Sequence, residues 1–124
     1  MVKIETFKDL KVWQKSHHLV LIVYRLTRSF FSDERYSLVS QIRRAVVSIA
    51  SNIVEGFNRR SIKDSLNFYN ISRSSLEEVK YQLLVVHDLD YISELDYQNV
   101  VSQCDKVGKM LNAWSNSQRI NFNS

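Results

Sequence analysis

The sequence has no proline, two glycines and a single cysteine among its 124 residues. One cysteine excludes a disulfide-stapled scaffold within the chain. Two glycines are too few for a P-loop or a dinucleotide-binding fingerprint, which both depend on glycine-rich turns. An all-β fold also needs turn residues at regular spacing, so that class is excluded too. The remaining composition, 44% hydrophobic and 24% charged, is ordinary for a globular protein.

Long hydrophobic runs are missing as well. The run Leu19–Val23 is among the longest, whereas a bilayer-spanning helix needs roughly 20 apolar residues. The first nine residues lack the apolar core of a signal peptide. We therefore expect one domain over residues 1–124, located in the cytoplasm and without a membrane partner.

Hydrophobic residues recur at steps of three and four along most of the chain, which is the period of amphipathic helices. Thr6, Ser61 and Ser93 are each followed three positions later by an aspartate, a pattern typical of helix starts. These signals predict an all-α fold with helices at roughly 9–29, 34–57, 63–89 and 94–116 and a frayed tail at 117–124. Short connections between long helices then favour an up-down-up-down antiparallel four-helix bundle.

The first two predicted helices have more apolar surface than one bundle interior needs. On the first helix, one row is Leu10, Trp13, His17, Leu21, Tyr24 and Phe31, and the row beside it is Leu19, Ile22, Leu26 and Phe30. Such a wide apolar face predicts a second buried surface, against another copy of the chain. By the same periodicity we expect His17 to be a core histidine, and Cys104, on the apolar row of the fourth helix, to be a buried, inert thiol.

A polar stripe crosses the second predicted helix. Ser48, Ser51 and Asn52 are poor helix formers, because their side chains compete for backbone hydrogen bonds. A helix that contains all three within five positions indicates a specific requirement for them. The stripe consists of Gln41, Arg44, Ser48, Ser51, Asn52 and Glu55.

This segment resembles the four-helix-bundle family of proteins encoded in intervening sequences of 23S ribosomal RNA genes. The family pattern falls on Leu38, Gln41, Arg43, Arg44, Ala45, Ser48, Asn52, Ile53, Glu55, Gly56 and Phe57. The segments 7–14, 74–78 and 89–92 also resemble the family, so the likeness covers nearly the whole chain. Two positions depart from it. The family usually has proline in the first interhelical turn, where this chain has Phe31 and Ser32, and glycine where this chain has Ser74.

The resemblance implies a homo-oligomer, most often a pentameric ring of bundles. The family is also similar to the accessory protein of diversity-generating retroelements, a basic pentameric barrel that binds nucleic acid and a reverse transcriptase. No catalytic residues are implied by either relative. Interface candidates from the motif are Gln41, Arg44, Ser48, Asn52, Glu55 and Gly56, and Gly56 also looks like a helix end that needs a small residue.

Positive charge is concentrated in the first half of the chain. Residues 1–62 carry 11 basic and 5 acidic side chains, and residues 63–124 carry 6 and 8. Clustered cations can bind nucleic-acid phosphates. The candidate phosphate contacts are Lys8, Lys11, Lys15, Arg43, Arg44, Arg59 and Arg60. The same cations can also be an ordinary solvated surface, or pair with carboxylates at a subunit interface.

Three function classes follow from these observations. The first is a non-enzymatic homo-oligomer that binds RNA or DNA through its basic surface. The second is a protein–protein adaptor for a reverse transcriptase or a ribosomal component. The third is an enzyme on a bundle scaffold, for which the sequence offers no recognisable catalytic set. A di-iron bundle needs paired Glu-x-x-His steps, which are missing here, so we expect no metal and no cofactor.

Overall fold

The computed structural model describes residues 3–30 and 33–123, with the side chains of 33–35 and 121–123 outside that description. Within these ranges the chain forms a short 3-10 helix, η1 (Phe7–Asp9), and four α-helices, with no strand. The α-helices are α1 (Lys11–Thr27), α2 (Asp33–Phe57), α3 (Ile62–Asp88) and α4 (Glu94–Asn123). The predicted all-α four-helix bundle is therefore confirmed.

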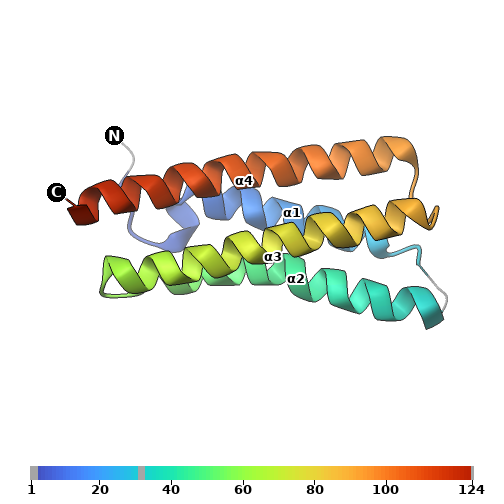
Figure 1. Cartoon of the computed structure of the whole chain (residues 1–124), viewed down its shortest axis with the longest axis horizontal. Coiled ribbons are helices and arrows are strands. Elements are labelled where there is room, and N and C mark those ends of the chain that lie inside the picture. Colours follow the sequence, from blue (N-terminus) through green and yellow to red (C-terminus); the bar gives the residue numbers. More distant parts are fainter. Residues whose placement is uncertain (1–2, 31–32, 124) are drawn as a thin grey trace.

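The four helices pack in a closed cycle, with α2 and α3 as the most closely packed pair. In Figure 1 the chain runs along the bundle through α1, returns through α2, and repeats this path through α3 and α4. Both termini consequently lie at the same end of the bundle (Figure 1). The turn residues Phe31 and Ser32, where the family usually has proline, lie outside the described residues.

The first predicted helix is divided in two. Thr6 does form a capping box, because its hydroxyl accepts from the Lys8 N–H and the Asp9 carboxylate accepts from the Thr6 N–H. This box closes only the single turn of η1. Leu10 then adopts an extended backbone (ψ 122°) and buries its side chain, and α1 begins after it.

The last helix is longer than predicted. Residues 117–124 were expected to fray, but α4 continues to Asn123. Side-chain hydrogen bonds support this part of the helix: the Ser117 hydroxyl donates to the Trp114 carbonyl at 2.7 Å, and Arg119 donates to the Asn116 side chain at 2.9 Å. Ser124 lies outside the described residues.

The core of α1 differs from the predicted rows. The buried row is Val12, Ser16, Leu19, Val23 and Thr27, while His17, Leu21 and Tyr24 are exposed. Ser16 and Thr27 are tolerated inside because their hydroxyls donate to the carbonyls of Val12 and Val23 in the preceding turn, both at 2.8 Å. A serine or threonine that satisfies its hydroxyl in this way packs as a small, nearly apolar residue.

Candidate nucleic-acid interface

The polar stripe of α2 lies along the seam with α3. The Ser48 and Ser75 hydroxyls are 2.8 Å apart and share a hydrogen bond across the two helices. The Asn52 amide donates to the Ser48 carbonyl at 2.8 Å and to its hydroxyl at 3.0 Å. These half-buried polar groups therefore satisfy one another within one chain, so Ser48 and Asn52 have a structural role in the seam.

Serines of α3 continue this contact toward the end of α2. The buried Ser72 hydroxyl donates to the Ile49 carbonyl, and the buried Ser65 hydroxyl donates to the Gly56 carbonyl, both at 2.7 Å. Small side chains allow two helix backbones to approach closely. Each serine hydroxyl also gives a backbone carbonyl of the facing helix a second hydrogen-bond donor. The structure thus uses a row of α3 serines that the sequence analysis did not single out.

Gly56 is buried in the last turn of α2, which ends at Phe57, so the prediction of a helix end that needs a small residue is confirmed. A Cβ at this position would lie 2.5 Å from Cε1 and 2.9 Å from Cδ1 of Tyr69, and 3.1 Å from the Ser65 carbonyl oxygen. The backbone of Gly56 is not in the left-handed region, since no glycine in the described residues has a positive φ. Glycine is required here because α3 comes too close for any side chain.

The other motif residues lie at the exposed edge of the seam. Gln41 and Arg44 line a shallow hollow with Ser48, Ser75 and Glu78. Glu55 is exposed and pairs with Arg59 at 3.0 Å, one turn further along the chain. Among the described side chains, no carboxylate lies within ion-pair distance of Arg44, so its guanidinium is available to an outside partner.

The two neighbouring arginines of the motif differ in environment. Arg43 donates from Nε to the Thr27 hydroxyl at 2.9 Å and from Nη2 to the Tyr24 carbonyl at 3.2 Å. Its guanidinium also lies over the Tyr24 ring, 4.5 Å from the centroid. A cation at these last carbonyls of α1 is favoured by the helix dipole. Arg43 is thus engaged within the fold, in contrast to Arg44.

The remaining predicted cations lie in two other places. Arg59 stacks over the Phe68 ring at 4.4 Å in addition to its ion pair with Glu55. Arg60 is exposed in the turn between α2 and α3. Lys8 is exposed on η1, and Lys11 and Lys15 lie on α1 facing α4. The seven predicted cations therefore do not form one patch.

A groove between α1 and α4, which we call the α1–α4 groove, combines two of the predicted lysines with two further cations. Lys11, Gln14, Lys15 and His18 line one hollow of this groove together with Met110 of α4. Arg25 of α1 and Lys106 of α4 line a second hollow, whose only carboxylate among the lining residues is Asp96. Four permanent cations and one carboxylate give the groove a net positive charge.

Arg25 and Lys106 were not among the predicted phosphate contacts. Arg25 lies on the same helix as Lys11 and Lys15, so helical spacing could have added it. Lys106 comes from the half of the chain with excess negative charge. No sequence signal pairs it with the lysines of α1, because that neighbourhood exists only once α4 packs against α1.

Cys104 and His17 were the two predicted core residues with reactive side chains. Cys104 is buried as predicted, and desolvation raises the pKa of its thiol to about 12. The thiol is thus protonated near neutral pH and is a poor nucleophile. The prediction for His17 is wrong, since it is exposed and stacks on Trp13 with ring centroids 4.9 Å apart.

A histidine in the last turn of α3, His87, contacts two carboxylates at the surface. His87 Nε2 lies 2.5 Å from a Glu94 carboxylate oxygen, and Nδ1 lies 3.1 Å from Asp88. Hydrogen bonds to Glu94 and then to Asp88 raise the pKa of His87 above its ordinary value of 6.5. Hydrogen bonds from Gln98 and then His87 lower the pKa of Glu94 below 4.5.

This arrangement predicts a pH-dependent contribution to stability. Protonated His87 stabilises the fold, so its contribution is complete below pH 6.5 and is lost as pH rises through the higher folded-state pKa. The contribution of Glu94 is complete above pH 4.5 and is lost as pH falls through its lowered pKa. We expect His87→Gln to be more destabilising at about pH 5.5 than at about pH 8.5 in urea unfolding. An equal effect at both pH values would contradict a charged His87–Glu94 pair.

Two further findings bear on the kinds of site present. Among the side chains that the structure describes, those of residues 3–30 and 36–120, no three His, Cys, Asp or Glu gather where they could hold a metal ion. None of the helices in the described parts of the chain is both long and apolar enough to cross a membrane.

Comparison with known proteins agrees with the fold and with the motif in α2. No curated protein matches the sequence. A solved structure of a protein with unknown function from the S23 ribosomal protein family of Bacteroides thetaiotaomicron is 24% identical. The alignment covers 84% of this chain and 97% of that chain with a TM-score of 0.78, which shows a common fold. A sequence model of the 23S rRNA-intervening sequence protein family matches residues 8–113, so this chain belongs to that family.

Proposed function

We propose that this protein is a non-enzymatic, cytoplasmic homo-oligomer that binds RNA, or other nucleic acid, through a basic surface. The observation that carries the proposal is the α1–α4 groove, where Lys11, Lys15, Arg25 and Lys106 outnumber Asp96. Phosphates of a nucleic-acid backbone follow one another at regular spacing, so a cationic groove along two parallel helix axes suits them. Binding through phosphates alone would be independent of base sequence.

Exposed apolar side chains support the oligomer. Leu21, Tyr24 and Val47 keep 38%, 37% and 39% of their surface exposed. Arg43 of α2 donates hydrogen bonds to Tyr24 and Thr27 of α1, so Tyr24 lies at the α1–α2 seam. Leu21 is one helical turn from Tyr24, and Val47 is one turn from Arg43, so both lie further along the same seam. A neighbouring copy that covered this seam would use the surplus apolar face of α1. A ring would also repeat the basic groove in every subunit and so strengthen weak phosphate contacts by avidity.

The test is a titration of a fluorescein-labelled single-stranded RNA across a salt series, with light scattering on the same sample. We expect a mass near five times the 14.6 kDa of one chain. We expect affinity to fall steeply with salt. Lys11→Glu combined with Lys15→Glu should reduce the slope of log affinity against log salt by about 0.7 for each phosphate that the variant no longer neutralises.

A matched variant controls for overall charge. Lys63 and Lys109 are exposed and line neither hollow of the α1–α4 groove. Reversing both changes the net charge as much as the groove variant does, but should leave the slope unchanged. Equal losses of affinity in the two variants would place binding outside the groove. An oligomer that binds no RNA at low salt would overturn the nucleic-acid proposal and favour the protein–protein adaptor, and a monomer would overturn the ring.

A further inference from the structure

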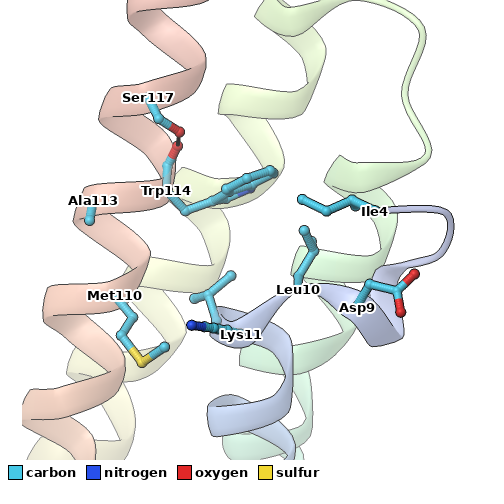
Figure 2. Close-up of a pocket in the computed structure, with 9 residues that line it drawn as sticks. Ile4, Asp9, Leu10, Lys11, Met110, Ala113, Trp114 and Ser117 are labelled. Carbon is cyan, nitrogen blue, oxygen red and sulfur yellow. Dashed lines mark hydrogen bonds between the residues drawn. The ribbon is translucent and has the colours of Figure 1, made fainter. Parts of the chain in front are cut away.

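An apolar cavity of about 410 Å³ lies at the end of the bundle that holds both termini. It opens between the N-terminal segment, the start of α1 and the last turns of α4. Figure 2 shows the Trp114 ring extending from α4 toward Ile4 and Leu10, with Met110 one turn earlier on the same helix. Its apolar lining residues are Ile4, Leu10, Val12, Met110, Ala113 and Trp114. The volume is within the range of pockets that hold small organic ligands, roughly 300–1,000 Å³.

The one carboxylate at the cavity is already engaged elsewhere. Asp9 Oδ2 accepts hydrogen bonds from the Glu5 N–H at 2.9 Å and the Thr6 N–H at 3.0 Å. In Figure 2 this carboxylate is turned away from Trp114 and Met110. Asp9 therefore holds the N-terminal segment, and with it Ile4, beside the cavity. The Asp9 carboxylate keeps its charge but points away from the space between Trp114 and Met110 (Figure 2).

Positive charge lies on the opposite side. The Lys11 amine faces Met110 in Figure 2. Lys11 and Met110 also line the neighbouring hollow of the α1–α4 groove, which has a volume of about 420 Å³. Lys15 and His18 line that hollow as well. The apolar cavity and the basic hollow are thus adjacent, with Lys11 and Met110 lining both. Among the described side chains, none of the carboxylates lies within ion-pair distance of Lys11 or Lys15.

We propose that this cavity binds a small amphipathic carboxylate of the fatty-acid type. The hydrocarbon chain fills the space against Trp114 and Leu10, and the carboxylate pairs with Lys11 and Lys15 in the adjoining hollow. A nucleobase suits the cavity poorly, because its polar edge needs hydrogen-bonding partners. The Ser117 hydroxyl, which also lines the cavity, already donates to the Trp114 carbonyl at 2.7 Å.

Ligand binding can be followed by the fluorescence of Trp114. The chain has two tryptophans, so Trp13→Phe leaves Trp114 as the sole tryptophan while retaining an aromatic ring at position 13. In this background we expect decanoate, titrated below its micellar concentration, to give a saturable change with one ligand per chain by calorimetry. Lys11→Gln should weaken decanoate binding about tenfold, because it removes a charge-assisted hydrogen bond. Binding of 1-decanol, which has no charge, should change less than twofold.

Two further variants separate a specific site from general adsorption of an amphiphile. Ala113 is exposed on α4, so Ala113→Trp can fill the cavity without entering the core. Because this variant adds a tryptophan, its binding is measured by calorimetry, where it should weaken decanoate binding at least tenfold, with circular dichroism confirming an unchanged helix content. Lys109→Gln removes an exposed lysine that lines neither hollow and should leave binding within twofold.

Three results would overturn the inference. They are the absence of a saturable signal with decanoate, undiminished binding by Ala113→Trp, and equal weakening of decanoate and 1-decanol by Lys11→Gln. All measurements are made without nucleic acid. A failure here therefore leaves the RNA titration unaffected, and a protein that binds no RNA can still bind decanoate.

Discussion

Replacing Gly56 with alanine should lower the free energy of unfolding by about 1–3 kcal/mol, as overpacking typically does. On an exposed helix the same change would stabilise by up to about 1 kcal/mol, because alanine is the better helix former. The sign is reversed here because the new Cβ would lie 2.5 Å from the ring of Tyr69. That ring is buried, and the Ser65 carbonyl at 3.1 Å belongs to the backbone of α3, so neither can move aside cheaply.

Gly108→Ala is the matched control. A Cβ at Gly108, in the middle of α4, would lie 3.4 Å from a Leu76 methyl group, which is ordinary van der Waals contact. This variant should keep or raise stability by up to about 1 kcal/mol. Urea unfolding of both variants measures the difference directly. If Gly56→Ala were as stable as Gly108→Ala, the close approach of α2 and α3 would be wrong.

Replacing Arg43 with methionine should lower the free energy of unfolding by about 1–2 kcal/mol, since hydrogen bonds to charged groups are worth about that much. The change removes the bonds to the Thr27 hydroxyl and the Tyr24 carbonyl, together with the stacking on the Tyr24 ring. Methionine preserves the length and the apolar stem of the side chain. The decrease in stability therefore measures the guanidinium contacts between α1 and α2.

Arg44→Met provides the comparison within the same helix turn. Arg44 is exposed, and its guanidinium has no ion-pair partner among the described side chains. A surface change of this kind usually alters stability by no more than about 0.5 kcal/mol. Chemical denaturation of the two single variants tests the assignment. Equal destabilisation would mean that the two motif arginines do not differ in role, contrary to their different hydrogen bonding.

The basic surface shows how far the candidate site could be predicted. Charge counting and helical spacing placed Lys11 and Lys15 on one face of α1, and the structure shows both lining one hollow against α4. Charge counting could not separate Arg43, which is bonded to α1, from Arg44, which is not. It also missed Lys106, because the pairing of α4 with α1 is a contact between distant parts of the chain.

By itself, the sequence determined the features that depend on neighbouring residues. The capping patterns are confirmed, because the hydroxyls of Thr6, Ser61 and Ser93 each accept a hydrogen bond from a backbone N–H of the following turn. Helical periodicity also places Ile42 and Ile49 of α2 on one hydrophobic row and Leu111 of α4 on another, and all three are buried. These signals are readable because a cap and a helical period involve only residues a few positions apart.

Tertiary structure alone decided how the faces of the helices are used. On α1 it buried the row containing Ser16 and Thr27 and left Leu21 and Tyr24 at the surface. It made Gly56 a point of close contact with Tyr69, and it combined the N-terminal segment with α4 into an apolar cavity. Helical periodicity is compatible with more than one buried face on the same helix. A serine whose hydroxyl donates to a carbonyl of its own helix, such as Ser16, can be buried in the core like other small residues. Which face becomes the core depends on how closely two helix backbones can approach, and that distance is a property of the packed pair.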